Sequence, residues 1–281
     1  MANIHPTSIV EDGAILADDV EVGPFCFVNS KAKIGAGTKL LNHVAIHNRV
    51  TLGENNTIWP FTTIGGSPQD LKYKGEDSEV IIGDNNQIRE NVTIHIGTAN
   101  DKAVTRIGSN NLIMVGVHVG HDCVIGDHVV IANAVLMAGH VKIESNAAIG
   151  GAAAIHHFVK IGQFSYVGGM SRIVADVPPF MLIEGNPARV RKVNSVLLKR
   201  HQLSDEDIEP LKLACRMLFL RLEEGAAVGR TEEHLATLED RFPDDPRINT
   251  LITDMRSSMN GIHGRSREAA RRDNPFKNPV K

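Results

Sequence analysis

The chain has 281 residues, of which 42% are hydrophobic and only 4% are aromatic, and its formal net charge is −3. A charge so close to zero gives no indication of nucleic-acid binding or of attraction to anionic membranes. The sequence enters a regular repeat at Ile4 without a basic region or an apolar leader. We therefore expect a cytoplasmic protein with no membrane span.

An apolar residue recurs every six positions over residues 4–64, 82–94 and 107–173. The fourth residue after each of them is small almost throughout, as at Ala32 and Cys123. A six-residue period fits neither an α-helix nor an antiparallel meander, but it is typical of a parallel β-helix in which three hexads form one coil. One branched and one small inward side chain on each side would fill such a narrow prism at native density.

Two segments interrupt the repeat. Residues 65–76 are rich in turn formers and charges, and their inward positions would be Asp70 and Glu76. Burying those carboxylates without partners would be costly, so we expect this segment to loop out. Residues 97–102 lengthen one interval to thirteen and form a second excursion. Loops that leave a rigid scaffold often carry substrate contacts.

The three cysteines have the character of packing residues. Cys26 and Cys123 fall on small inward positions of the repeat, and Cys215 lies in a helical pattern. We interpret them as buried thiols of a reducing compartment, not as nucleophiles or metal ligands.

The repeat ends near residues 176–179, and a helical spacing begins at about Val190. A capped helix start is indicated at Ser204, and residues 231–238 and 249–259 suggest two more helices.

We therefore predict three regions: a β-helix domain at residues 1–186, a helical domain at 187–260 and a basic tail at 261–281. The tail carries four arginines and two lysines against two acidic residues. Such a run is typical of a disordered end, although it could also attract an acidic partner.

Seven of the thirteen histidines lie between His95 and His157. Residues eighteen apart should stack one coil above another, about 4.8 Å apart. We call such a set of equivalent positions a column. One column contains His121, Gly139 and His157, and the adjacent one contains Asp122, His140 and Phe158. His118 and His156 lie within a few residues of these columns. None of these histidines is inward, so the alternative is a set of ordinary solvated surface side chains.

His121, Asp122 and Gly139 together have the parts of a general-base site. An imidazole suits proton removal near neutral pH, and a neighbouring carboxylate can hold its tautomer. A glycine lets a backbone amide approach a developing oxyanion. No serine or cysteine shares the column, which favours direct transfer to an acceptor hydroxyl over a covalent acyl-enzyme.

A zinc enzyme is the alternative for a histidine-rich edge, as in the carbonic anhydrases built on this type of helix. Their ligand pattern resembles two histidines five residues apart with a third from a preceding coil. Here His118 and His121 are three apart, so we predict no metal site.

Several strings resemble the UDP-N-acetylglucosamine acyltransferase family, the acyl-carrier-protein-dependent enzymes that start lipid A synthesis. The resemblance covers residues 4–199. Its most selective strings are Gln69-Asp70-Leu71-Lys72-Tyr73, Asn91-Val92-Thr93-Ile94-His95, His118-Val119-Gly120-His121-Asp122-Cys123, Ala138-Gly139-His140-Val141, Asp176-Val177-Pro178-Pro179 and Gly185-Asn186.

The resemblance implies a left-handed β-helix in a homotrimer, with active sites in clefts between subunits. It implies that His121 is the general base for the sugar 3-hydroxyl, that Asp122 assists it, and that the Gly139 amide receives the oxyanion. Gly169 would leave the acyl groove open. The length of the acyl chain is not predicted. The donor would be the phosphopantetheine thioester of acyl-carrier protein, with no other cofactor. The implied substrate-binding residues are Gln69, Asp70, Lys72, His95, His118, His140, His156, His157, Gly169, Asn194 and Arg200.

Three positions depart from the family pattern. His157 stands where glutamine is common, Pro187 replaces a histidine, and His201 replaces the second of two adjacent arginines. A histidine holds phosphate less well than an arginine fork. A different acceptor sugar, such as a 3-amino analogue, is therefore an alternative. Two further alternatives are an N-acyltransferase acting on an acylated amino sugar, which usually has a domain before the first hexad, and a non-catalytic trimeric scaffold.

Overall fold

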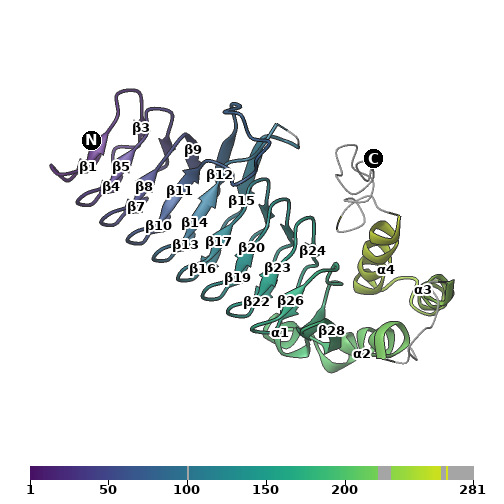
Figure 1. Cartoon of the computed structure of the whole chain (residues 1–281). Helices are drawn as coiled ribbons and strands as arrows, with labels where there is room; N and C mark the ends of the chain where they lie inside the picture. Colours follow the sequence, from purple (N-terminus) through teal and green to yellow (C-terminus); the bar gives the residue numbers. More distant parts are fainter. Residues whose placement is uncertain (100, 221–228, 261–263, 265–281) are drawn as a thin grey trace, which may run out of the picture.

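The computed structural model describes residues 1–99, 101–220, 229–260 and 264. They form a left-handed parallel β-helix followed by a small helical region, as predicted (Figure 1). The predicted basic tail lies outside the described residues except for Gly264.

Three sheets form the sides of the prism. The first sheet has, in spatial order, β1 (Asn3–Ile4), β4 (Glu21–Val22), β7 (Lys39–Leu40), β10 (Thr57–Ile58), β13 (Gln87–Ile88), β16 (Leu112–Ile113), β19 (Val130–Ile131), β22 (Ala148–Ile149), β25 (Tyr166–Val167), β27 (Met181–Gly185) and β28 (Ala188–Val193). The second has β2 (Ile9–Val10), β5 (Phe27–Val28), β8 (Ala45–Ile46), β11 (Thr63–Gly66), β14 (Thr93–His95), β17 (His118–Val119), β20 (Leu136–Met137), β23 (Ala154–Ile155) and β26 (Arg172–Ile173). The third has β3 (Ile15–Leu16), β6 (Lys33–Ile34), β9 (Arg49–Leu52), β12 (Glu79–Ile82), β15 (Val104–Ile107), β18 (Val124–Ile125), β21 (Lys142–Ile143) and β24 (Lys160–Ile161).

Successive coils pair in parallel with the register that the repeat predicts. Val119 lies opposite Met137, and Met137 lies opposite Ile155. The second residue of nearly every short strand is buried, and these residues form one continuous core. Alternation along the strand therefore places the six-residue apolar position inside the prism and its neighbours outside.

The corners of the prism bend through residues with positive φ. Asp122, His140 and Phe158 have φ of 59°, 62° and 64° and stack in one column at the corner between the second and third sheets. This left-handed conformation is sterically costly for most side chains, but Asn, Asp and His tolerate it best. The corner geometry therefore accepts the polar residues that the site needs.

A ladder of polar side chains runs inside the prism at the corner between the third and first sheets, where small residues were expected. Asn56 Oδ1 accepts hydrogen bonds from the backbone and side-chain nitrogens of Asn86, both at 2.9 Å. Asn86 Nδ2 also donates to the Gly108 carbonyl, and Asn86 Oδ1 accepts from the Asn111 amide. The three asparagines are at most 2% exposed. They satisfy backbone groups that the corner would otherwise leave unpaired.

Both predicted interruptions leave the helix. Residues 67–78 form a loop between β11 and β12, and residues 96–99 and 101–103 lie between β14 and β15. We call these the Gln69 loop and the Thr98 loop.

The helical region contains α1 (Ser195–Arg200), α2 (Asp205–Cys215), a π-helical turn η1 (Arg216–Leu220), α3 (Gly229–Arg241) and α4 (Pro246–Met259). Ser204 caps α2 in a capping box with Asp207, which confirms the predicted start. The strand β28 pairs antiparallel with β27 across the domain boundary predicted at residue 186. Its last residue, Val193, packs in the helical core. No helix within the described ranges is long and apolar enough to cross a membrane.

Helix α4 returns to the β-helix (Figure 1). Lys160 on β24 is buried, and its ammonium contacts Glu144 at 3.1 Å and also Asp254 of α4. Burial lowers the pKa of Lys160, although the carboxylates of Glu144 and Asp176 oppose the shift in part. The buried ion pairs connect the helical region to the last coils.

Asn86→Ala should lower the free energy of unfolding by about 2–4 kcal/mol, because it removes three side-chain hydrogen bonds and leaves the Gly108 carbonyl and the Asn111 amide without these partners. Urea denaturation of the variant and the wild type at one protein concentration measures the change. Asn133→Ala, at an exposed corner, is the matched control and should stay within about 0.5 kcal/mol of the wild type. Equal losses in both variants would show that the ladder has no special stabilising role.

Candidate active site

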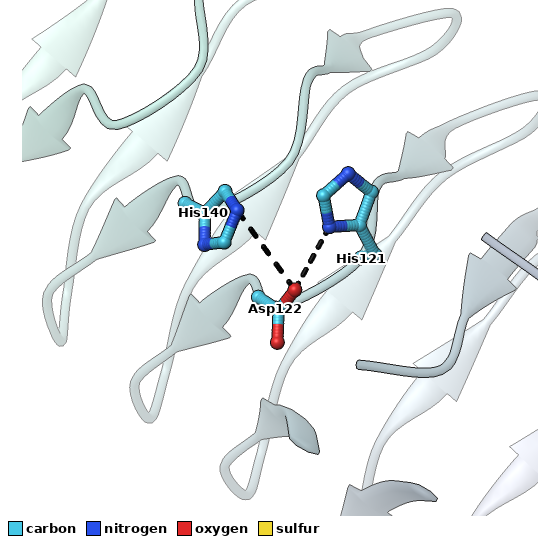
Figure 2. A group of neighbouring side chains, drawn as sticks. All are labelled: His121, Asp122 and His140. Carbon is cyan, nitrogen blue, oxygen red and sulfur yellow. Dashed lines mark hydrogen bonds and ion pairs between the residues drawn. The ribbon is translucent and has the colours of Figure 1, made fainter. Parts of the chain in front are cut away.

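The predicted catalytic residues meet at the corner between the second and third sheets. Figure 2 shows His121 and His140 on successive coils, on either side of the Asp122 carboxylate. The rings of His121 and His140 are nearly perpendicular, with centroids 5.0 Å apart. The stacking predicted from the repeat therefore brings these three side chains together.

His121 and Asp122 form a hydrogen-bonded pair. The distance between His121 Nδ1 and Asp122 Oδ2 is 2.8 Å. A carboxylate only accepts, so this contact assigns the proton to Nδ1 and leaves the Nε2 lone pair for a substrate. The Asp122 side chain is 1% exposed, whereas that of His121 is 16% exposed. The imidazole is thus the accessible member of the pair.

The Thr98 loop satisfies the buried carboxylate. Asp122 Oδ1 accepts from the Thr98 amide at 2.9 Å, and Asp122 Oδ2 accepts from the Thr98 hydroxyl at 2.7 Å. The Asp122 amide donates to Thr105 Oγ1 at 2.8 Å. A buried charge is tolerated only when its oxygens are hydrogen-bonded, and these donors meet that requirement.

Gly139 lies directly against the His121 ring. A Cβ at Gly139 would stand 2.5 Å from both Cε1 and Nε2 of His121, so any side chain there would displace the imidazole. Within the described residues, no backbone or side-chain acceptor takes the Gly139 amide proton. The Gly139 amide is therefore free to donate to a ligand.

A second histidine pair adjoins the first. The rings of His95 and His118 meet edge to face with centroids 4.9 Å apart, and His118 Nδ1 hydrogen-bonds Thr93 Oγ1 at 2.8 Å. Burial, and then repulsion from His118 and His121, lowers the pKa of His95 to about 4. Burial and His121 also lower the pKa of His118. Both side chains are consequently neutral at physiological pH.

His156 and His157 extend the cluster by one coil. Their ring centroids are 3.9 Å apart, and His157 contacts the edge of Phe158. His118 and His156 line a groove of about 360 Å³ on the second sheet. Leu136 and Ile173 give this groove apolar walls.

The other predicted site residues lie elsewhere in the protomer. Gln69, Asp70 and Lys72 are on the Gln69 loop, where the Lys72 amide donates to Asp70 Oδ1. Gly169 is exposed at the corner between the first and second sheets. The Gln69 loop leaves the prism at the same corner as the Thr98 loop and His121, between the second and third sheets, whereas Gly169 stands at a different corner.

Asn194 and Arg200 line a cavity of about 400 Å³ outside the first sheet, together with Tyr166 and Leu182. The Asn194 side chain caps α1 through Leu197 and donates to the Phe164 carbonyl at 3.0 Å. These hydrogen bonds place α1, and with it Arg200, over the first sheet.

His121, Asp122 and His140 are also the one group within the described residues whose donor atoms lie close enough together to hold a metal ion, all within 4.8 Å. A metal would have to compete with the bonds that His121 and Thr98 already make to Asp122 Oδ2. The same atoms serve an acid–base pair without rearrangement.

The cysteines do not supply a nucleophile. All three are free and buried. Burial raises the pKa of the Cys123 thiol to about 12 and that of Cys215 to about 11, so neither is a thiolate near neutral pH.

Comparisons with known proteins identify the family. A curated relative from Saccharophagus degradans, an acyl-[acyl-carrier-protein]–UDP-N-acetylglucosamine O-acyltransferase, is 45% identical over 93% of this chain and 99% of its own. The chain belongs to the UDP-N-acetylglucosamine O-acyltransferase family. The family model for domain 2 of UDP-N-acetylglucosamine O-acyltransferase matches residues 176–263, and the bacterial transferase hexapeptide model matches residues 31–66 and 105–139.

Solved structures of this family agree in fold. The UDP-N-acetylglucosamine O-acyltransferase of Moraxella catarrhalis is 41% identical, with a TM-score of 0.85 over 91% of this chain and 97% of that one. The acyltransferase of Arabidopsis is 34% identical, with a TM-score of 0.79 over 91% and 96%. The resemblance predicted from the loop and histidine strings is thereby confirmed.

Some contacts of the site were not predicted from the sequence. Thr98, Asp101 and Thr105 hold Asp122 and His140 from the Thr98 loop or directly after it. The thirteen-residue interval breaks the periodicity there, so column counting cannot place the loop residues. Thr93 could have been found, because the register sets it beside His118.

The three departures from the family pattern lie at different places. His157 contacts the histidine cluster, Pro187 is in the turn between β27 and β28, and His201 meets the ring of Phe164 edge to face. The His201 contact stabilises the end of α1 against the last coils, a role that needs no phosphate.

The low pKa of His95 predicts a pH-dependent contribution to stability. The unfolded chain takes up a proton at this residue near pH 6.5, whereas the folded chain does so only near pH 4. Stability should therefore fall as the pH drops from 6.5 to 4, and His95→Gln should reduce that fall. Urea unfolding at about pH 7.5, 5.5 and 4.5 covers this window and measures how the free energy of unfolding depends on pH.

His5→Gln, at an exposed position near the N-terminus, is the control for this experiment. An unchanged slope in the His95 variant, with the fold intact by circular dichroism, would contradict the assigned burial.

Proposed function

We propose that this chain transfers an acyl group, 3-hydroxylated in the leading hypothesis, from acyl-carrier protein to the 3-hydroxyl of UDP-N-acetylglucosamine, the first step of lipid A synthesis. The name of the Saccharophagus relative supports the donor and the acceptor. The observation that carries the proposed chemistry is the 2.8 Å bond between His121 and Asp122, with the free Gly139 amide beside it.

The proposed reaction is a single displacement at the thioester carbonyl. His121 Nε2 removes the proton from the sugar hydroxyl as its oxygen attacks the carbonyl carbon. The Gly139 amide donates to the oxyanion of the tetrahedral intermediate. When this intermediate collapses, the carbon–sulfur bond breaks, and the imidazolium returns its proton to the pantetheine sulfur. Asp122 stabilises the imidazolium in between, so no covalent acyl-enzyme is needed.

We also propose that the complete site forms between subunits of a homotrimer. The first sheet is the side of the prism opposite the corner that holds His121. Arg200, which would meet the nucleotide phosphates or the acidic carrier protein, lies over that first sheet. We infer that one ligand reaches both residues when the His121 corner of one protomer faces the first sheet of its neighbour. Exposed apolar side chains, among them Phe25, Phe61 and Met170, provide surface for such contacts.

In this proposal the remaining site residues bind the substrates. His95, His118, His140, His156 and His157 would contact the sugar and the acyl-pantetheine arm. Gln69, Asp70, Lys72 and Asn194 would contact the sugar nucleotide, and Gly169 would border the acyl groove. The phosphopantetheine thioester is the only proposed cofactor, and it arrives with the carrier protein.

We also propose that the protein is cytoplasmic, and its three free, buried cysteines are consistent with a reducing compartment. The sedimentation of the purified chain would give its subunit number.

His121→Ala should reduce kcat by about 10²–10⁴-fold, because the variant lacks the base. The assay incubates purified protein with 3-hydroxyacyl-carrier protein and UDP-N-acetylglucosamine, and chromatography measures the acylated sugar nucleotide.

Activity of the wild type in excess EDTA is expected to persist, since the proposed chemistry needs no metal. Gly139→Ala should also be strongly impaired, because its Cβ would collide with the His121 ring.

His128→Ala, on the corner between the third and first sheets, is the matched control. A His121→Ala rate within a few-fold of the wild type would show that the assigned base is wrong. Preferred acylation of a 3-amino analogue by the wild type would instead change the acceptor.

A further inference from the structure

The ring of His140 is fixed from three directions. It stacks on Phe158 with centroids 4.4 Å apart and an angle of 8° between the planes. Its edge contacts the His121 ring. Its Nδ1 lies 3.1 Å from Asp101 Oδ2, a carboxylate on the Thr98 loop, 39 residues earlier in the chain. Phe158 sets the plane of the ring, and Asp101 sets its rotation within that plane.

The Asp101 contact also decides which nitrogen faces the reaction. The carboxylate accepts the Nδ1 proton, so Nε2 is the atom that turns toward Asp122 Oδ2, 3.9 Å away (Figure 2). That distance exceeds a hydrogen bond, so Nε2 is not committed to Asp122. The side chains of His140 and Asp101 are only 7% and 14% exposed, which shields their contact from water.

The Thr98 loop is held firmly enough to serve this role. The Thr98 carbonyl accepts from the amides of Asp101 and Ala103, and the Thr98 amide and hydroxyl bind Asp122. The loop therefore supplies a donor pair to one carboxylate of the site and a carboxylate to the neighbouring histidine. A cavity of about 310 Å³ opens beside these residues, lined also by Lys102 and Lys142.

We propose that Asp101 is a positioning residue for acyl transfer: it holds His140 as the Nδ1–H tautomer, with Nε2 directed at the bound sugar nucleotide. This inference rests on the proposed function of the site. In this proposal Asp101 acts on the reaction through His140, whose ring it orients.

Asp101→Ala should lower kcat/KM for UDP-N-acetylglucosamine by about tenfold, mainly through KM, because one hydrogen bond that orients a binding group is lost. Asp101→Asn should recover most of the activity, since its amide oxygen accepts the same Nδ1 proton. In a His140→Ala background, Asp101→Ala should cause no further loss, because the residue through which it acts is gone.

Nitrogen-15 spectra of the histidine rings test the tautomer without substrate. In the wild type, the His140 signals, identified by their loss in His140→Ala, should show a protonated Nδ1, and Asp101→Ala should change this pattern. These spectra remain informative if the enzyme acts on another acceptor, which separates a failure of this inference from a failure of the proposed function.

Equal losses from Asp101→Ala with and without the His140 side chain would overturn the proposal, because the loop would then act independently. Unchanged His140 spectra or unchanged kinetics in Asp101→Ala would also overturn it. If Asp101→Ala does not fold, Asp101→Ser provides the same test, since its short hydroxyl cannot span the distance to His140.

Discussion

The vertical register between coils is the constraint on which the rest of this structure depends. Strands of the β-helix pair in parallel with the strand one coil later, through backbone hydrogen bonds such as that from the His118 amide to the Val135 carbonyl. Because these bonds fix the spacing at about one inter-strand distance, residues eighteen apart lie side by side on successive coils. A slip by one residue would turn the core outward, so the buried aliphatics enforce the register of the site as well.

The Asp122 carboxylate shows how the scaffold and the chemistry are joined. Its backbone takes the left-handed corner conformation, its oxygens accept from Thr98, and its Oδ2 holds His121. Each bond offsets part of the cost of keeping a charge away from water. The carboxylate can therefore face the imidazole in a dry environment, where electrostatic stabilisation of a transient imidazolium is greatest.

The interior of the prism and its exterior corners have different roles. The prism interior carries nearly all of the packing, including the asparagine ladder that satisfies the corner backbone. The exterior side chains are consequently not needed for packing, and one corner carries a row of histidines. The helical region has a core of its own around Leu211, Leu235 and Leu251, and its Lys160–Asp254 contact holds it against the last coils. This arrangement places Arg200 over a side of the prism that His121 does not share.

The sequence by itself determined the β-helix, its register, and the meeting of His121, Asp122, Gly139 and His140. A strict six-residue period leaves one way to bury the aliphatic side chains, and the columns follow from it. The tertiary structure alone decided what the aperiodic segments contribute. Thr98 and Asp101 lie in a loop whose length breaks the repeat, so their contacts with Asp122 and His140 depend on how the chain returns to the prism. The partners of Asn86 and of Lys160 could not be predicted from the sequence either. Asn86 bonds to groups on neighbouring coils, and Lys160 contacts a carboxylate on a distant helix.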